Sequence, residues 1–348
     1  MASSADKLSF FALTASGLEG ISAQEIATLP HIRIDVVSYR RIAGTCFADP
    51  ASLCTLRTVD DVFFDVATWS ELGRPRSSLD RLRSLGASLD LYPTALRCAR
   101  LRRVPMPPRF SLTVSFVGKR NYTGEEIKRV LADTIARRYC GWMYEQEDRL
   151  ADLNIRVFLE HETAYVGVRI SKVALHDRWY QRVHLPGALK PSVAAALVLL
   201  AGTTPTSTVL DPCCGSGTIL IEAALQGASI CGGDKNPLAI AAARTNLATA
   251  GVSAVIQQWD ATLLPLANVR INCIITNLPW GRQVRIQEEL SSFYQRIFTG
   301  MRQILAPGGS IVILTNAPEE IDPLDLSYEE RIDISLFGQR PTILVFKN

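Results

Sequence analysis

The chain has 348 residues, 47% of them hydrophobic and 20% charged, a composition that excludes disordered and collagen-like proteins. No apolar run approaches the roughly 20 residues of a membrane-spanning helix, so the sequence predicts no association with a membrane. The net charge of +3 is unevenly spread, since residues 1–190 carry 27 basic and 21 acidic side chains whereas residues 191–348 carry 10 and 13. The length favours two or three domains.

The first 75 residues alternate short strand-like and helix-like segments, an α+β pattern that predicts a small first domain over residues 1–75. In chain order the expected elements are a strand at 9–14, a helix at 21–29, strands at 31–37 and 44–48, a helix at 52–58 and a strand at 63–69.

Residues 76–172 form the second expected domain. Its expected elements are helices at 77–85 and 89–100, a strand at 110–117, a helix at 123–139 and a hairpin of strands 154–160 and 163–170. Thr123 and Glu126 have the spacing of a helix capping box. The stretch Leu91–Gly124 has no carboxylate, which is typical either of a solvated face or of a surface that contacts a polyanion. The candidate polyanion contacts are Arg97, Arg100, Arg102, Arg103, Lys119 and Arg120.

A charged linker at 173–190 precedes a third expected domain at 191–348, where short apolar strands alternate with helices, as in a parallel sheet wrapped by helices. After a buried helix at 193–200, strands are expected at 208–210, 229–232, 254–257, 272–276 and 310–315. The last two strands, 328–337 and 342–347, are joined by only four residues, too few for a parallel crossover. They predict an antiparallel hairpin that closes the sheet.

The eight cysteines form no Cys-x-x-Cys pair and have no histidine at ligand spacing, so we predict neither a metal site nor a disulfide framework. Most lie among apolar residues, where a free cysteine behaves as a small hydrophobe. We therefore expect a reducing compartment, the cytoplasm.

The strongest motif is Asp-Pro-Cys-Cys-Gly-Ser-Gly-Thr at 211–218, which joins a strand to a helix through a glycine turn. It is not the dinucleotide fingerprint, because position 220 is Leu, and no Gly-Lys-Ser/Thr follows as in a P-loop. Asp211 ahead of the turn would repel a phosphate and suits a cationic ligand.

Two further acids end the next two strands. Asp234 is placed to accept both hydroxyls of a ribose, and Asp260 is placed to meet an adenine amine. Either acid taken alone is more often an ordinary loop cap than a ligand. Three acids at the carboxyl ends of successive parallel strands, with Asp211 the first, point to one ligand crevice.

The fourth strand ends in Asn-Leu-Pro-Trp at 277–280, and with this motif the chain resembles the S-adenosylmethionine-dependent methyltransferases that modify the amines of bases. The sequence at 211–218 resembles their first motif, with Cys213 and Cys214 where an aromatic or Met commonly starts the pair. The second position of the Asn-Leu-Pro-Trp motif is Leu278, where many members of the family have Pro. The resemblance implies a Rossmann-fold methyltransferase with S-adenosylmethionine as cofactor.

The chemistry of amine methylation explains these residue types. The side-chain oxygen of Asn277 and the carbonyl of Leu278 accept the two N–H bonds of a poorly nucleophilic amine, Pro279 stiffens the loop, and Trp280 stacks on a flipped base. These four residues are the candidate catalytic set. The candidate cofactor-binding residues are Pro191, Ser192, Asp211, Cys213, Gly215, Ser216, Gly217, Thr218, Asp234, Lys235, Asp260, Ala261 and Asn277.

The front half resembles the THUMP-containing RNA methyltransferases. This resemblance is carried by Phe-Ala-Leu-Thr-Ala-Ser-Gly-Leu-Glu at 11–19, Ala-Tyr-Val-Gly-Val at 164–168, Leu-His-Asp-Arg-Trp-Tyr at 175–180 and Leu-Lys-Pro-Ser-Val-Ala-Ala-Ala-Leu at 189–197. It implies that residues 1–75 are a ferredoxin-like domain and that residues 76–172 are a THUMP RNA-binding domain.

The family resemblance implies transfer of a methyl group to N2 of a guanosine in tRNA, in the region of the acceptor stem. Arg282 and Arg285, just after the catalytic motif, are then placed to contact RNA phosphate. The same motifs leave open another structured RNA (ribosomal or small nuclear), adenine-N6 methylation, and a catalytically inactive RNA-binding subunit. A small activating protein is a candidate partner, because some members of the family need one.

Overall fold

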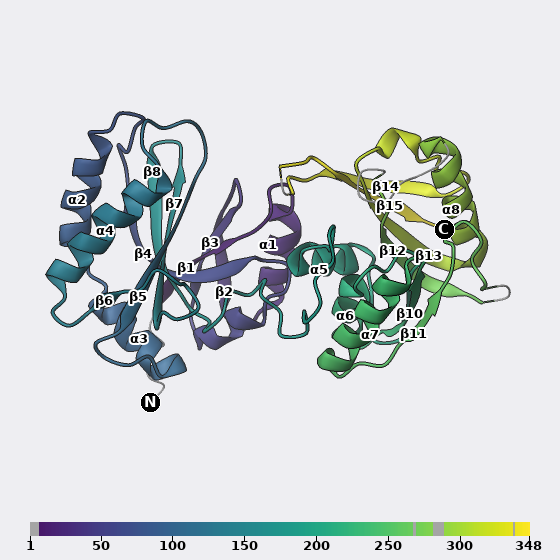
Figure 1. The fold of residues 1–348 in the computed structure, drawn as a ribbon, viewed down its shortest axis with the longest axis horizontal. Coiled ribbons are helices and arrows are strands. Elements are labelled where there is room, and N and C mark those ends of the chain that lie inside the picture. The colour runs from purple at the N-terminus through teal and green to yellow at the C-terminus, as the bar shows by residue number, and fades with distance from the viewer. Residues whose placement is uncertain (1–6, 267–268, 281–288, 337) are drawn as a thin grey trace. The chain divides into compact units, whose positions relative to one another are not determined.

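The computed structural model describes residues 7–266, 269–280, 289–336 and 338–348 and divides the chain into two compact units (Figure 1). The N-terminal unit contains the residues up to Leu13, Glu25–Leu56 and Asp61–Leu175. The C-terminal unit contains Thr14–Gln24, Arg57–Asp60 and His176–Asn348. Two short segments from the front of the sequence therefore fold with the back half, as do residues 176–190, which the sequence analysis assigned to a linker.

The N-terminal unit is built on an eight-stranded sheet in the order β2-β3-β1-β4-β8-β7-β5-β6. Its strands are β1 (Leu8–Leu13), β2 (Ile32–Ser38), β3 (Arg41–Cys46), β4 (Asp61–Trp69), β5 (Arg109–Phe116), β6 (Met143–Tyr144), β7 (Leu153–Glu160) and β8 (Thr163–Arg169). The sheet is continuous from the first expected domain into the second, because β4 pairs with β8 in antiparallel register.

The helices of this unit are α2 (Ser78–Ser88), α3 (Tyr92–Arg102) and α4 (Gly124–Arg138), whereas α1 (Glu19–Thr28) belongs to the C-terminal unit up to Gln24 and to the N-terminal unit from Glu25. Helix α4 begins with the predicted capping box, since the Thr123 hydroxyl accepts from the Glu126 backbone and the Glu126 carboxylate accepts from the Thr123 backbone. The expected helix at 52–58 is instead a short 3-10 helix, Pro50–Thr55, which Asp49 caps at Ala51.

The C-terminal unit has a seven-stranded sheet in the order β11-β10-β9-β12-β13-β15-β14. Its strands are β9 (Thr208–Asp211), β10 (Ser229–Asp234), β11 (Val255–Gln258), β12 (Ile271–Asn277), β13 (Leu305–Thr315), β14 (Ser327–Asp333) and β15 (Thr342–Lys347). The first five are parallel, and β15 runs antiparallel to both β13 and β14, which confirms the predicted closing hairpin. Strand β14 ends at Asp333, four residues earlier than predicted, and Ile334 belongs to the loop before β15.

Helices cover this sheet on both faces. They are α5 (Pro191–Leu200), α6 (Thr218–Ala224), α7 (Pro237–Ala250) and α8 (Leu290–Ile304). Alternate strand residues point to opposite faces, so Ile275 packs with α5, α6 and α7, whereas Ile274 packs with α8. Leu18 and Ile21, from the front segment Thr14–Gln24, are buried in the first of these cores. Among the described residues no helix has the length and apolarity that crossing a membrane requires.

The second front segment is fixed by a buried carboxylate. Glu222 on α6 is fully buried and accepts from Arg57 Nε at 2.6 Å, Tyr180 Oη at 2.6 Å and Arg178 Nε at 3.2 Å. A buried carboxylate is stable only when such donors surround it. Segment Arg57–Asp60 is therefore part of the support of the helix that follows the glycine turn.

Candidate functional site

The carboxyl ends of β9, β10 and β12 open onto one cavity of about 730 Å³. This is the edge of a parallel sheet where ligands bind in α/β proteins. The predicted site residues that line it are Asp211, Cys213, Gly215, Ser216, Thr218, Asp234, Lys235, Asp260, Ala261, Asn277, Leu278, Pro279 and Trp280. The structure thus brings together the three acids and the Asn-Leu-Pro-Trp loop, which lie up to 69 positions apart in the sequence.

The glycine turn between β9 and α6 depends on backbone conformations that other residues rarely adopt. Gly215 has φ 51° and Gly217, the N-cap of α6, has φ 83°. A Cβ atom on Gly217 would also lie 3.4 Å from Ala243 Cβ. The turn presents the Gly215 N–H to Asp234 Oδ2 at 3.0 Å, which ties the turn to the end of β10.

Asp211 organises the floor of the cavity. It is buried, and its Oδ1 accepts from Thr276 Oγ1 at 2.9 Å and from the Cys213 N–H at 3.1 Å. Burial, only partly offset by these bonds, raises the pKa of Asp211 to about 7. Asp211 therefore joins β9, the glycine turn and β12.

Asp234 and Asp260 stand at the side of the cavity formed by β10 and β11. Asp234 accepts from the backbone of Gly215 and Asn236, which fixes its rotamer. Asp260 accepts from Lys235 Nζ at 2.9 Å and from both the N–H and hydroxyl of Thr262. Although burial opposes the shift, the Thr262 and Lys235 bonds lower the pKa of Asp260 to about 2, so this carboxylate is ionised at neutral pH.

The Asn-Leu-Pro-Trp loop carries acceptors and donors that have no partner within the described residues. Both Asn277 Oδ1 and Trp280 Nε1 are buried from solvent without a hydrogen bond there. A buried polar atom without a partner costs free energy, and such atoms are often completed by a ligand. This loop is held in place, since the Leu278 N–H donates to the Leu314 carbonyl at 3.0 Å.

Two aromatic residues that the sequence analysis left without a role support these loops. Tyr294 on α8 is buried, and its hydroxyl donates to the Pro279 carbonyl at 3.0 Å. Trp259 donates from Nε1 to the Pro212 carbonyl at 3.0 Å. In the sequence, Tyr294 and Trp259 are distinguished only by their apolar neighbours. Ordinary aromatic residues of a core have the same neighbours, so the sequence could not predict the hydrogen bonds of these two.

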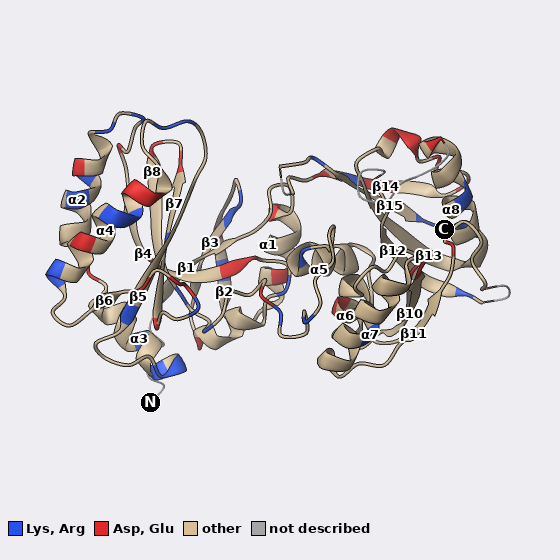
Figure 2. Cartoon of the chain, in the orientation of Figure 1, with Lys and Arg blue, Asp and Glu red and all other residues tan. Residues whose placement is uncertain are grey.

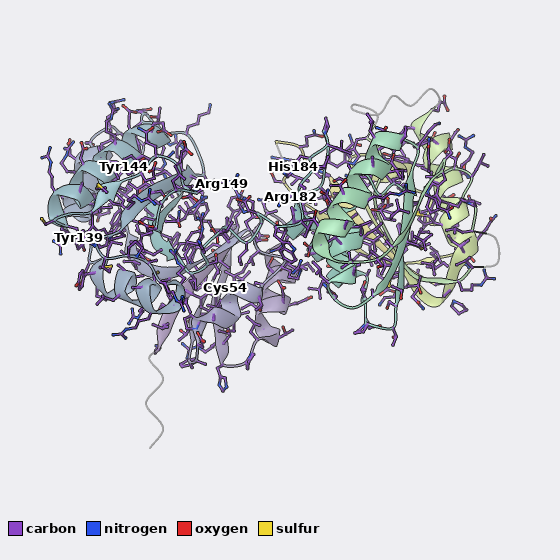
Figure 3. All side chains as sticks on the ribbon, turned by 60° about the horizontal axis from the view of Figure 1, so that its bottom comes forward. Cys54, Tyr139, Tyr144, Arg149, Arg182 and His184 are labelled. Atoms are coloured by element: carbon purple, nitrogen blue, oxygen red, sulfur yellow. The ribbon has the colours of Figure 1, made fainter. Side chains whose placement is uncertain are left out.

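The segment 184–189 forms a wall of the cavity that the sequence analysis also missed. Figure 3 labels Arg182 and His184 on this part of the chain. Asn246 on α7 is fully enclosed, and its side chain accepts from the N–H groups of Arg182 and Val183 at 3.0 Å each. Its amide nitrogen also donates to the carbonyls of Val183 and Ser216, so one side chain links this wall to the glycine turn.

Pro191, Ser192 and Gly217 are predicted cofactor residues that do not line the cavity. The Ser192 hydroxyl instead donates to Asp60 Oδ1 at 2.7 Å, while Lys190 Nζ lies 2.7 Å from Asp60 Oδ2. These contacts attach the start of α5 to the front segment Arg57–Asp60. The observed contacts of Ser192 and Lys190 therefore stabilise the fold.

The basic candidates lie in the N-terminal unit, four of them on or next to α3, whose last turn is basic (Figure 2). Arg102 donates to the carbonyls of Asp152 and Arg169, and Arg120 donates to those of Leu72 and His161. Both guanidinium groups thus stabilise the fold. Within the described residues the side chains of Arg97, Arg100, Arg103 and Lys119 have no hydrogen-bond or ion-pair partner. Arg282 and Arg285 lie outside the described residues.

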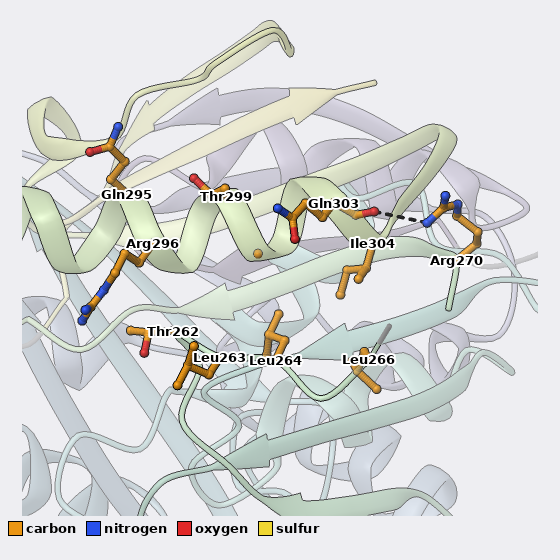
Figure 4. A pocket seen from close by; sticks show the side chains of 11 residues that line it. Thr262, Leu263, Leu264, Leu266, Arg270, Gln295, Arg296, Thr299, Gln303 and Ile304 are labelled. Atoms are coloured by element: carbon orange, nitrogen blue, oxygen red, sulfur yellow. Dashed lines mark hydrogen bonds between the residues drawn. The ribbon is translucent and has the colours of Figure 1, made fainter. Parts of the chain in front are cut away.

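A second cavity of about 730 Å³ lies between α8, residues 262–266 and Arg270 (Figure 4). Arg270 crosses its end by donating to the Gln303 carbonyl at 3.2 Å. It contains neither the three acids nor the Asn-Leu-Pro-Trp loop, so the chemistry belongs to the first cavity. In the described part of the chain no three His, Cys, Asp or Glu side chains gather as metal ligands would.

Known proteins resemble the chain over more than half of its length. A tRNA (guanine(6)-N2)-methyltransferase of Thermus thermophilus is 30% identical over 205 residues, which are 58% of this chain and 60% of that protein. The U6 snRNA (guanine-N(2))-methyltransferase THUMPD2 of Mus musculus is 30% identical over 198 residues, 55% of this chain and 35% of that protein. The chain thus spans between about a third and two thirds of these relatives' lengths.

Two solved structures share the fold over almost the whole chain. TrmN from Thermus thermophilus aligns with a TM-score of 0.77 at 23% identity, covering 98% of this chain and 99% of that one. A predicted N6-adenine-specific DNA methylase from Listeria monocytogenes aligns with a TM-score of 0.73 at 20% identity, covering 98% and 96%. The fold is therefore the Rossmann-like methyltransferase fold with its α+β front half.

The family described as UPF0020, RMKL-like, methyltransferase domain matches residues 178–326. That segment contains the glycine turn, the three acids and the Asn-Leu-Pro-Trp loop, and hence most of the cavity wall. The part of the chain that holds most of the cavity is thus similar to the RMKL-like methyltransferase domains.

Proposed function

We propose that the chain is an S-adenosylmethionine-dependent RNA methyltransferase that acts on the exocyclic N2 of a guanosine in tRNA. The observation that carries this proposal is the buried Asn277 Oδ1, which has no hydrogen-bond partner among the residues that the structure describes and lies in the cavity that also holds Asp234 and Asp260. The relatives named as tRNA and U6 snRNA guanine-N2 methyltransferases support the same chemistry.

The residues present fit the cofactor. Asp234 is placed to take the ribose hydroxyls, and the ionised Asp260 is placed to accept from an adenine amine. The cationic sulfonium suits a cavity with three carboxylates and only one lysine, Lys235, which is already paired with Asp260. When bound, S-adenosylmethionine supplies an electrophilic methyl group.

The chain's own residues then prepare the amine. Asn277 Oδ1 accepts one N–H and the Leu278 carbonyl accepts the other, which directs the nitrogen lone pair away from the ring and toward the methyl donor. Tyr294 keeps this loop fixed through the Pro279 carbonyl. The amine becomes acidic as it gains positive charge, so its proton passes to water without a strong base. Trp280 offers a stacking face for the flipped base.

We propose that the front of the chain holds RNA through a ferredoxin-like domain (1–75) and a THUMP domain (76–172). The methyltransferase domain (191–348) follows a connecting segment (173–190), which folds with it from His176 onward. The unpartnered cations of the THUMP domain, Arg100, Arg103 and Lys119, are exposed and free to contact phosphate. We also propose that the protein works in the cytoplasm. The relatives' names make U6 snRNA a second candidate substrate, to be distinguished by the same assay.

The test is methylation of total cellular RNA by the purified chain with labelled S-adenosylmethionine, followed by nucleoside analysis of each RNA class. Label in N2-methylguanosine from tRNA is the expected result. Asn277→Ala should lower kcat by about 100-fold or more, because it removes an acceptor that acts on the developing charge. Cofactor binding, measured by calorimetry, should be retained.

The matched control is Asn272→Ala at the opposite end of β12, where the side chain accepts from the Thr208 backbone outside the cavity. It should keep full activity. Undiminished activity in Asn277→Ala would contradict the catalytic assignment, and label in N6-methyladenosine would replace guanine by adenine as the target. If only the chain with a cell extract is active, a small activating protein is required.

A further inference from the structure

The loop between β14 and β15 contributes two residues to the cavity that no motif marked. Leu336 and Gln339 line it. Their backbones face each other, with the Leu336 N–H donating to the Gln339 carbonyl at 3.0 Å and the Gln339 N–H returning to the Leu336 carbonyl at 2.9 Å. These two backbone hydrogen bonds fix the position of the Gln339 backbone, from which its side chain extends.

The order of the strands shows which end of the cavity this loop occupies. The acids Asp234 and Asp260 follow β10 and β11 on one side of β12, whereas β13 and β15 lie on the other side. Asn277 pairs with Leu314 on β13, and the next residue of β13, Thr315, pairs with Thr342 at the start of β15. The loop therefore adjoins the Asn277 end of the cavity, away from the cofactor acids.

The chemistry of Gln339 matches what a guanine leaves exposed there. Among the described residues, nothing hydrogen-bonds its side-chain amide, which offers one acceptor and two donors. With the N2 amine held by Asn277 and Leu278, the neighbouring N1–H and O6 remain to be paired. The amide oxygen can accept from guanine N1–H while the amide nitrogen donates to O6. Adenine has the opposite pattern at these positions, because its N1 is an acceptor and its N6 amine is a donor.

On the basis of the function proposed above, we propose that Gln339 is a specificity-determining residue that pairs with the N1–H and O6 edge of the target guanine. Leu336 beside it supplies an apolar contact to the ring. Half-burial of Gln339 makes the pairing selective, because a polar group removed from water loses more when its partner is missing.

The loop is held by the front segment of the same unit. The Ser335 N–H donates to the Ser16 carbonyl at 2.9 Å, and Gly17, with φ 95°, lies so close that a Cβ atom there would be 2.3 Å from the Asp333 carbonyl oxygen. Glu19 Oε2 accepts from the Gly17 N–H at 2.8 Å. Ser16 and Gly17 are thus positioning residues for the loop that carries Gln339.

The experiment compares two substrates that both carry the reacting amine. One is the RNA that the wild type methylates, and the other has 2-aminopurine in place of the target guanine, which lacks O6 and the N1 proton. Gln339→Leu is compared with the wild type by kcat/KM on each RNA. We expect the preference for guanine to fall by roughly 10- to 100-fold in the variant, the value of a bidentate base contact.

The ratio of kcat/KM on the guanine RNA to kcat/KM on the 2-aminopurine RNA reports the contact of Gln339 with N1–H and O6. The different reactivity of the two amines affects the variant and the wild type equally, so it cancels when their ratios are compared. Loss of activity on guanine with unchanged activity on 2-aminopurine supports the proposal, and an unchanged ratio overturns it. Calorimetric binding of S-adenosylmethionine confirms that Gln339→Leu is folded, and Gln303→Leu on α8, at the second cavity, is the control expected to leave the ratio unaltered. A wild type that methylates no RNA would contradict the proposed function instead.

Discussion

At the scale of single residues, Asp211 is the acid that differs most from its predicted role. The sequence placed it as a counter-charge for a cationic ligand, and it does line the cavity, but both of its hydrogen bonds go to one oxygen, Oδ1, and hold the protein together. The sequence identified Asp211 as a site residue only by its position at the end of a strand, ahead of the glycine turn. Its burial and its contact with Thr276, 65 residues away, depend on the packing of β9 beside β12.

Asp211 makes stability depend on pH. Its folded pKa of about 7 lies above the ordinary aspartate value of 3.8, so the folded state binds more protons between these pH values and the contribution of Asp211 to stability is lost as pH rises. Asp211→Asn keeps an Oδ1 acceptor for Thr276 and Cys213. Relative to the wild type without cofactor, its Tm should rise by several degrees at pH 8 and change little at pH 4, as measured by calorimetry. An equal difference at both pH values would refute this account.

At the scale of elements, α8 supports the catalytic loop although it contributes little to the cavity wall. Helix α8 packs one apolar face on the sheet through Ile297, Phe298 and Met301. This packing aims the Tyr294 hydroxyl at the Pro279 carbonyl. The loop is thereby fixed by a rigid helix, the arrangement that precise positioning of a reacting amine requires.

Tyr294→Phe removes this hydrogen bond, together with the longer one that the hydroxyl accepts from Thr315 Oγ1 at 3.4 Å, and keeps the ring. We expect kcat to fall by about 10-fold or more, because a small displacement of the loop misplaces the amine acceptors. The affinity for S-adenosylmethionine should be unchanged, since the acids are untouched. Steady-state kinetics and calorimetry measure the two quantities, and Tyr328→Phe on exposed β14 is the control. A fall in cofactor affinity with kcat intact would assign Tyr294 to the cofactor side.

The sequence predicted elements and strand-end residues well because both follow from local pattern and from the geometry of parallel strands. Asp211, Asp234, Asp260 and Asn277 share one edge wherever their strands are parallel neighbours. Tertiary partners could not be predicted in this way. Asn246 meets a segment 63 residues earlier in the chain, and nothing in helix α7 distinguishes it from an exposed polar residue.

At the scale of the whole molecule, the methyltransferase fold includes residues from the front of the sequence. Arg57 and Asp60 reach α6 and α5 through Glu222 and Ser192, all within the C-terminal unit. A carboxylate as deeply buried as Glu222 is tolerated only because Arg57, Arg178 and Tyr180 surround it. The unit is thus assembled from three stretches of chain.

Glu222→Ala should therefore lower the free energy of unfolding by about 3–5 kcal/mol, since it leaves buried guanidinium groups without their carboxylate. Urea unfolding of the full chain measures the loss. Asp80→Ala, which removes an exposed ion pair with Arg83, is the control and should have no measurable effect. A loss as small as that of the control would show that water replaces the carboxylate without cost.

The attachment of Ser16 to Ser335 has a consequence for how the protein is made. The two residues are 319 positions apart, and at about 5–20 residues per second the ribosome needs tens of seconds to join them. Until then Leu18 and Ile21, which are apolar and buried in the finished unit, lack most of their partners in the nascent chain. The contact of Ser16 with Ser335 therefore cannot form before the residues around Ser335 have been synthesised.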